Sequence, residues 1–179
     1  PEAARLRTCL VMVGCEPGAF RDELRTRAER LGVGSAVQLL GFVPHADLPG
    51  LLAGAEGLLM PSLAEGFGLP ILDAFAADVP VLTSDCSSMP EVAGDAAVYC
   101  DPQSATSIAA GIVALQDPEQ AAALRARGRR RLAAFTWEAT AKRMVAVYER
   151  AAAGRGRHAG SERAEQAEFV GAGSQGAGS

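Results

Sequence analysis

A glycine-bearing bend, lying between a short apolar run and a proline-led helical segment, constrains this chain more than any other feature. Residues 57–60 have the length and apolar composition of a buried strand. The segment from Pro70 to Ala77 is predicted to be a helix, because proline is favoured in the first turn, where its missing N–H is not needed. Gly66 and Gly68, in the bend, allow the backbone to come close to a ligand. The positive end of the following helix dipole favours an anion such as a diphosphate.

Two carboxylates accompany this bend. Glu65 lies within it, and Asp73 is expected near the first helical turn, so that both side chains could face one pocket. This arrangement suggests a site for a phosphate and a sugar. The alternative is that Glu65 is simply solvated and that Asp73 serves the helix dipole. The spacing alone does not decide between the two interpretations.

Strand-like and helix-like segments alternate along the first 153 residues, which is typical of an α/β fold with a Rossmann-like, doubly wound parallel sheet. The first run, residues 8–13, is continuously apolar and suits a strand covered on both faces. Such folds bind ligands at the carboxyl ends of the strands, so we expect the loops at Gly14, Phe42, Ser62 and Ser84 to converge. The remaining predicted strands are residues 36–40, 79–83 and 97–100, and the remaining predicted helices are 18–31, 46–52, 104–115, 118–134 and 136–153.

Four polar residues have the positions of helix-capping residues. Asp117 precedes Pro118, and Thr136 precedes another helical segment, so both are predicted N-terminal caps. Ser88 and Glu91 have the spacing of a capping box, which favours a structural role for Glu91. Residues 84–88 are predicted to form the loop that leaves the strand at 79–83.

Composition excludes several classes of protein. The formal net charge of the 179 residues is -4, which argues against nucleic acid as the main partner. We find no apolar run of eighteen residues and no signal-like N-terminus, so a cytoplasmic location is expected. The four cysteines lack C-x-x-C spacing, which disfavours zinc and a disulfide framework. Cys9 and Cys100 are expected to be buried thiols.

Two segments near the C-terminus have biased composition. Arginines occupy positions 125, 127, 129, 130 and 131, which is typical of a solvated helix face; contact with an anionic membrane surface is the alternative. Residues 154–179 contain mostly Gly, Ala, Ser, Arg, Glu and Gln, and are predicted to form a disordered tail after one domain at residues 1–153.

Several motifs occur together in one order, and in that order they resemble the C-terminal domain of the group 1 (family 4) retaining glycosyltransferases of GT-B fold. The resemblance extends from the start of the chain to about residue 151. The matching segments are residues 10–14 (LVMVG), 40–44 (LGFVP), 60–62 (MPS), 65–74 (EGFGLPILDA), 79–85 (VPVLTSD), 90–94 (PEVAG) and 135–138 (FTWE).

The resemblance implies a role for each residue that matches the family's donor site. Glu65 would contact hydroxyls of the donor sugar and orient it without acting as a nucleophile, and Asp73 would hold the ribose of the nucleotide. Phe42 and Val43 would lie against the base, and Gly14 would let the nucleotide approach. The other residues expected to bind the donor, chiefly through the backbone, are Ser62, Gly66, Phe67, Gly68 and Leu69. No D-x-D motif is present, so metal-independent transfer is expected, with no cofactor.

Three departures from the family pattern bear on these roles. Asp73 stands where a glutamate is usual and is one methylene shorter, and Glu16 stands where a second glycine is usual. In the family, a further strand and helix with an arginine and a lysine for the diphosphate, and an acceptor-binding domain, precede the matching region. Arg5 and Arg7 do not match those basic positions.

The sequence therefore predicts the donor-binding half of a glycosyltransferase, of mannosyl or glucosyl type, that transfers sugar poorly or not at all without its acceptor domain. The donor base, guanine or uracil, stays open. The alternative from another class is a non-catalytic module that binds a nucleotide sugar or another protein. A Rossmann dehydrogenase is disfavoured because no G-x-G-x-x-G follows the first strand.

Overall fold

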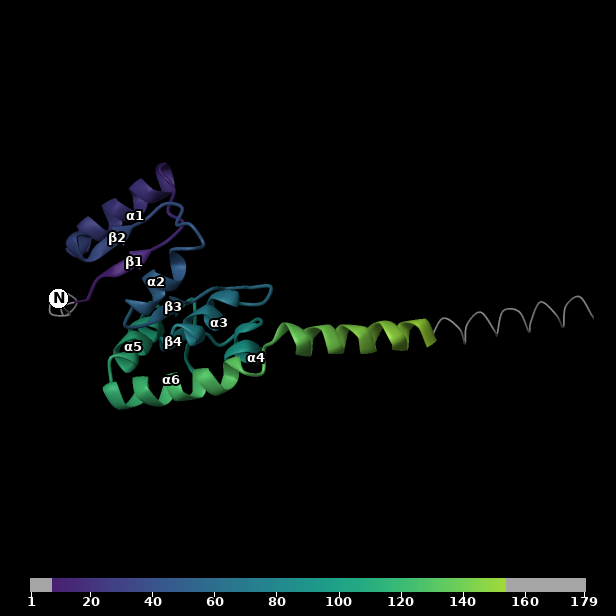
Figure 1. Cartoon of the computed structure of the whole chain (residues 1–179). Coiled ribbons are helices and arrows are strands. Elements are labelled where there is room, and N and C mark those ends of the chain that lie inside the picture. Colours follow the sequence, from purple (N-terminus) through teal and green to yellow (C-terminus); the bar gives the residue numbers. More distant parts are fainter. Residues whose placement is uncertain (1–7, 154–179) are drawn as a thin grey trace, which may run out of the picture. The chain divides into compact units, whose positions relative to one another are not determined.

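The computed structural model describes residues 8–153 (Figure 1). The chain divides into two compact units, Pro1–Arg129 and Arg130–Ser179, and each is considered by itself. The predicted tail at residues 154–179 lies outside the described residues. The prediction of a single domain over residues 1–153 therefore stays a prediction.

All strand pairs among the described residues of the first unit are parallel, which confirms the α/β class. β1 (Leu10–Met12) pairs with β2 (Val37–Leu39) in one sheet, with Leu10 opposite Val37. The second sheet has the order β3-β4-β5, with β4 (Val81–Ser84) between β3 (Leu58–Met60) and β5 (Ala97–Cys100). All five predicted strands are present, but their hydrogen bonds form two sheets, because no described strand bridges β1 and β3.

The helices whose bounds were predicted occur in the predicted order, with ends shifted by at most two residues; for α4 only a capping box had been predicted, without bounds. A short 3₁₀ turn, η2 (Gly34–Ala36), precedes β2 and was not predicted. Ser84, expected in a loop, is instead the last residue of β4, since it pairs with Cys100. The helices are α1 (Ala19–Arg30), α2 (Leu48–Ala53), α3 (Leu69–Ala76), α4 (Met89–Ala93), α5 (Ala105–Leu115) and α6 (Pro118–Leu132).

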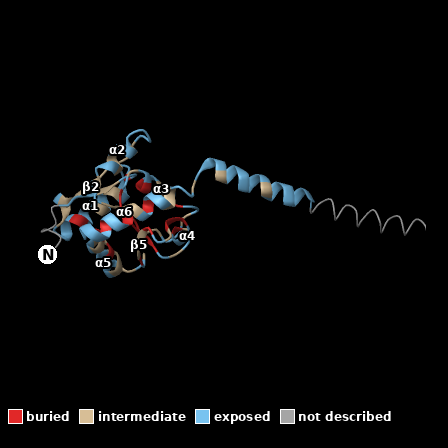
Figure 2. Ribbon diagram, turned by 60° about the horizontal axis from the view of Figure 1, so that its bottom comes forward, coloured by how far each residue is buried: buried red, intermediate tan, exposed pale blue. Residues whose placement is uncertain are grey.

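The core of this unit surrounds β4. All four of its residues are fully buried, and because side chains of a strand alternate between faces, both faces of the sheet are covered there. Figure 2 colours the buried residues red, including part of α4. Leu82 packs in a cluster with Cys100, Leu115 and Leu124, which come from β5, α5 and α6. Burial, followed by the negative charges of Asp85 and Asp101, raises the pKa of the Cys100 thiol.

Two glycines let helices approach this core closely. A Cβ added at Gly111 of α5 would lie 2.4 Å from Leu82 Cδ1, and one added at Gly128 of α6 would lie 2.7 Å from Phe75 Cδ1 of α3. Real Cβ atoms do not approach other atoms so closely, so both helices pack where only a glycine fits.

The first strand is more exposed than predicted. Leu10 is 41% exposed, Val11 and Met12 are half-buried, and Cys9, expected to be buried, lies exposed before the strand begins. Among the described residues β1 pairs with β2 alone, so the run at residues 8–13 is not covered as a central strand would be. The thiols that are buried are those of Cys15 and Cys100, and all four cysteines are free.

The predicted cap at Asp117 is confirmed. Its Oδ1 accepts hydrogen bonds from the backbone N–H groups of Glu119 and Gln120, both at 2.9 Å. At the start of α5, Ser104 also caps, with its hydroxyl accepting the N–H of Ser107 at 3.2 Å. Helices gain stability at their ends in this way, because the first N–H groups have no partner within the helix.

Replacing Asp117 with alanine should therefore destabilise the protein by about 0.5–2 kcal/mol, since two N–H groups lose their acceptor. Chemical denaturation measures the change. Asp117→Asn retains a side-chain oxygen and should recover most of the loss. A protein in which the alanine and asparagine variants are equally destabilised would contradict this account of the cap.

The arginine cluster lies largely on the exposed surface, as predicted for a solvated helix face, and three of its members also bond neighbouring turns. Arg125 Nε donates to the backbone oxygen of Asp78 at 3.1 Å, and Arg129 bonds the Asp78 carboxylate. Arg127 donates to the backbone oxygen of Asp95 at 3.1 Å. Three of the five arginines thus attach α6 to the turns after α3 and α4, because those turns present backbone and carboxylate oxygens to the helix.

In the second unit, residues 137–153 form a helix. Thr136 caps it as predicted, with its hydroxyl accepting the N–H of Ala139 at 3.1 Å. Trp137, at its start, is 86% exposed, and the Arg131 guanidinium lies 5.0 Å from the centre of the Phe135 ring. No helix among the described residues is both long and apolar enough to cross a membrane.

Candidate functional site

The bend connects the carboxyl end of β3 to the amino end of α3. β3 ends at Met60 and α3 begins at Leu69, one residue earlier than predicted, with Pro70 at the second helical position. Gly68 precedes the helix in the left-handed conformation, with φ 101° and ψ 43°, and its carbonyl accepts the N–H of Ile71 at 3.0 Å. The sharp entry into α3 therefore depends on a conformation that residues with a Cβ rarely adopt.

The two glycines of the bend differ in what they permit. A Cβ at Gly68 would lie 3.3 Å from Ile71 Cδ1, in addition to the strain of its positive φ. Gly66 lies outside the left-handed region, and an added Cβ would meet nothing within 4 Å. Gly68 is thus required by the fold itself, whereas Gly66 leaves the backbone open to an approaching molecule.

Glu65 is half-buried and its carboxylate has a partner. The Ser62 hydroxyl donates a hydrogen bond to Glu65 Oε1 at 2.9 Å. Ser62 is held in turn, because its backbone oxygen accepts the hydroxyl of Ser84 at 2.5 Å. The predicted residues Ser62 and Glu65 therefore lie together at the carboxyl end of the sheet, and the interpretation of Glu65 as merely solvated is wrong.

The loop after β4 holds the backbone of Glu65 through two serines. Ser87 Oγ accepts the Glu65 N–H at 3.2 Å and donates to the Glu65 carbonyl at 3.0 Å. Ser88 Oγ donates to the same carbonyl at 3.0 Å. The predicted capping box is wrong on this point: the Ser88 side chain makes no capping hydrogen bond to α4, because its hydroxyl is directed to Glu65.

Asp73 lies farther from the bend than predicted. It is the fifth residue of α3 and exposed, and no acid lies in the first turn, because the helix begins one residue early. The effect of the helix dipole decays within that turn, so a dipole role for Asp73 loses its basis. Among the described residues no hydrogen bond or ion pair joins Asp73 to Glu65, and a shared pocket for them stays a prediction.

A second group of predicted residues lies at the carboxyl ends of β1 and β2. Gly14, with φ 83°, donates its N–H to the Gly41 carbonyl at 3.1 Å, which places it beside the loop of Phe42 and Val43. Phe42 is 80% exposed, as a side chain available for stacking would be. The Glu16 carboxylate lies 3.3 Å from the position of a Cβ on Gly41, so it points toward this loop rather than away from it.

The sequence analysis missed Ser87 and assigned Ser88 a different role. Hydroxyls in a loop at the carboxyl end of a central strand are the only signal that pointed to them. Phe67 and Leu69, the other predicted residues of the bend, are 43% and 62% exposed. Among residues 8–153, no group of three or more His, Cys, Asp or Glu side chains is placed to hold a metal ion.

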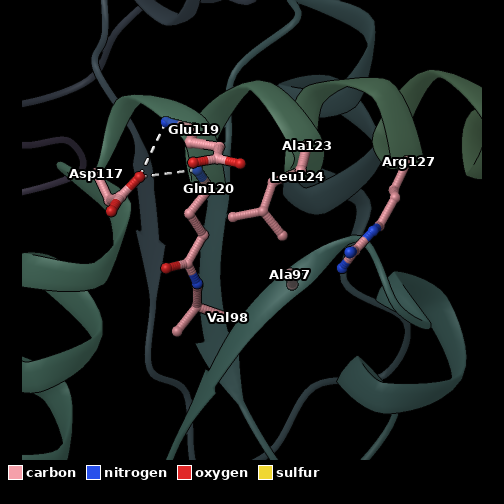
Figure 3. A pocket seen from close by; sticks show the side chains of 8 residues that line it. All are labelled: Ala97, Val98, Asp117, Glu119, Gln120, Ala123, Leu124 and Arg127. Atoms are coloured by element: carbon pink, nitrogen blue, oxygen red, sulfur yellow. Dashed lines mark hydrogen bonds between the residues drawn. The ribbon is translucent and has the colours of Figure 1, made fainter.

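A cavity of about 460 Å³ lies elsewhere, between β5 and α6 (Figure 3). Two of its charged side chains already have partners: Asp117 caps α6, and Arg127 binds Asp95. It contains none of the predicted site residues. The lining residues are Ala97, Val98, Asp117, Glu119, Gln120, Ala123, Leu124 and Arg127.

Comparison with known families gives the chain's affiliation. Residues 2–131 match the family model described as "Glycosyl transferases group 1". The chain belongs to the group 1 glycosyltransferases. Within this family it is 38% identical over 150 residues to the O-antigen chain mannosyltransferase B of Escherichia coli, covering 83% of this chain and 39% of that protein. It is 34% identical over 145 residues to a glycogen synthase of Mycobacterium tuberculosis, covering 79% of this chain and 34% of that protein.

A solved structure supports the fold. The sucrose-phosphate synthase of Thermosynechococcus elongatus superimposes with a TM-score of 0.73 at 29% identity, covering 85% of this chain and 40% of that one. The predicted fold class and family resemblance are thus confirmed. The chain spans about two fifths, or less, of the length of these proteins.

Proposed function

We propose that this chain is the donor-binding part of a glycosyltransferase that moves a mannosyl or glucosyl group from a nucleoside diphosphate to an acceptor. The observation that carries the proposal is the fixed position of Glu65, between the carboxyl end of β3 and the amino end of α3. Its carboxylate and both of its backbone polar groups are hydrogen-bonded by serines. Two of the relatives, a mannosyltransferase and a glycogen synthase, support the choice of sugars.

The start of α3 supplies an anion site of limited extent. Pro70 has no N–H, and the N–H of Ile71 is bonded to Gly68. Of the first three helical positions, only Leu69 therefore has an N–H for which the described residues show no partner. We assign this group, together with the helix dipole, to the diphosphate.

The chemistry follows from opposite charges at the two ends of the breaking bond. Positive charge develops on the sugar carbon and negative charge on the departing diphosphate. Glu65 would contact the sugar hydroxyls and favour the positive centre, while the Leu69 N–H and the positive end of α3 favour the leaving group. Fixed charges and dipoles of this kind stabilise a transition state because they need not reorient during the reaction.

In this proposal, the acceptor binds to a second domain. Because the chain spans two fifths or less of the three relatives described above, we expect binding of the donor by this chain and little transfer without the partner domain. The non-catalytic alternative predicts that joining such a domain restores no transfer from any nucleotide sugar.

The experiment is a thermal-shift and calorimetric titration with GDP, UDP and their mannose and glucose conjugates. A ligand at about one hundred times its dissociation constant should stabilise the fold by roughly 2.7 kcal/mol. Glu65→Gln should remove the extra affinity that a nucleoside diphosphate gains from its hexose. Asp73→Asn should weaken binding of the nucleoside diphosphate itself. Glu138→Gln, on the helix of the second unit, is the matched control. A folded protein that binds none of these ligands would refute the proposal.

A further inference from the structure

Ser87 has a backbone conformation that needs an explanation. Its φ of 57° is in the left-handed region, which is unfavourable for a residue with a Cβ, and among the described residues only Asp78 shares this feature. A glycine would adopt the conformation without strain but would lack a hydroxyl. The strained conformation is therefore explained by the hydroxyl of Ser87, which a glycine at this position would not supply.

That hydroxyl makes a two-way contact with a single residue. A serine hydroxyl has one hydrogen to donate and lone pairs to accept, and Ser87 uses both on Glu65, donating to its carbonyl and accepting its N–H. Ser88 adds a second donor to the carbonyl. The peptide groups on both sides of the Glu65 Cα are thus held by side chains of the neighbouring loop.

The position of the Glu65 carboxylate depends on these contacts. Within residues 8–153 its carboxylate is hydrogen-bonded by Ser62 alone, through Oε1. The Cα from which the side chain extends is restrained by the serines of the other loop. The two loops are further joined by Ser84 and by Cys86, whose Sγ lies 3.6 Å from the Leu63 oxygen.

We propose that Ser87 is a positioning residue, which holds the Glu65 backbone so that its carboxylate meets the hydroxyls of the donor sugar. The inference rests on the proposed function of Glu65 as the sugar-contacting acid. A residue that only stabilised the loop would not affect binding of the sugar alone. A positioning role predicts that Ser87 affects the affinity contributed by the sugar and leaves the affinity for the nucleotide unchanged.

The test compares Ser87→Gly, which removes both the hydroxyl and the strain, with Ser87→Ala, which removes only the hydroxyl. Asp78→Gly, which relieves the same strain elsewhere and also removes the carboxylate that bonds Arg129, is the control for amide exchange at Glu65. Amide exchange measured by NMR should quicken at Glu65 at least about tenfold in both Ser87 variants, because its N–H loses its acceptor, and should not change in Asp78→Gly. Melting temperature should fall less in Ser87→Gly than in Ser87→Ala.

Calorimetry on the same proteins gives the functional readout. The ratio of affinities for a hexose conjugate and its parent nucleoside diphosphate should fall in both Ser87 variants, with the affinity for the parent unchanged. In a Glu65→Gln background, Ser87→Gly should lower the ratio no further, because Ser87 acts through Glu65.

Three results would overturn the inference: unchanged exchange at Glu65, an unchanged affinity ratio despite faster exchange, or additive effects in the double variant. A wild-type chain for which the hexose adds no affinity would instead refute the proposed function, and with it the sugar role of Ser87. The exchange measurement would then still show whether the serines hold the Glu65 backbone.

Discussion

Replacing Leu82 with alanine should lower the free energy of unfolding by about 2–5 kcal/mol, because it opens a cavity at the centre of the core. Leu82 is fully buried in the middle strand of β3-β4-β5, where it packs against residues of β5, α5 and α6. Chemical denaturation measures the loss. Val113→Ala, on an α5 position that is 63% exposed, should change stability by less than about 0.5 kcal/mol and is the matched control.

A second substitution, at Gly111, tests whether the Leu82 side chain limits the space available beside α5. In the wild type, Gly111→Ala should destabilise by about 1–3 kcal/mol, since the new Cβ would lie 2.4 Å from Leu82 Cδ1. With Leu82→Ala already present, that atom is absent, and Gly111→Ala should stabilise by up to about 1 kcal/mol through helix propensity. Equal effects of Gly111→Ala in the two backgrounds would show that the close approach of α5 to Leu82 is not what limits this position.

Gly68→Ala should lose both stability and donor binding. Its φ of 101° costs a residue with a Cβ about 1–2 kcal/mol, and the contact with Ile71 adds to this cost. The backbone between Glu65 and α3 must then shift, so the stabilisation by nucleotide sugar should also disappear. Thermal melts with and without the ligand that proves best for the wild type measure both effects.

Gly66→Ala is the matched comparison for this prediction, two residues earlier in the same bend. Its position lies outside the left-handed region and has room for a Cβ, so stability should change by less than about 0.5 kcal/mol. Binding should still weaken, because the methyl group would project where the donor is proposed to approach. If both variants lost the same stability, backbone strain at Gly68 would not be the cause.

The order of strands and helices could be predicted because each element has its own hydrophobic pattern and is bounded by turn or capping residues. The run at residues 97–100 coincides with β5, and Asp117 and Thr136 cap the helices that they precede. Burial of β1 could not be predicted, since an apolar run shows what a strand could bury and not which neighbours cover it. Leu10 lies in a run that was predicted to be buried, and yet it is 41% exposed.

The candidate site could be predicted only where its residues lie close together in the sequence. The bend that carries Ser62, Glu65 and Gly68 is one continuous stretch, and it forms as expected. Ser87 lies twenty-two residues beyond Glu65, so its contact depends on the pairing of β3 with β4, which no short pattern reveals. Ser88 illustrates the same limit, because its spacing to Glu91 suggested a local partner while its hydroxyl bonds a distant one.

The polar side chains of β4 have a consequence for how tightly a ligand can be held. Thr83 Oγ1 donates to the Met60 carbonyl at 3.1 Å, and Ser84 Oγ donates to the Ser62 carbonyl just past the end of β3. Contact between the strands therefore continues beyond the last residue pair of their ladder and into the bend that follows β3, where the donor is proposed to bind. A molecule that arrives there meets loops whose conformational entropy was already lost when the protein folded. Little of its interaction energy is then needed to order them, and more of it appears as affinity.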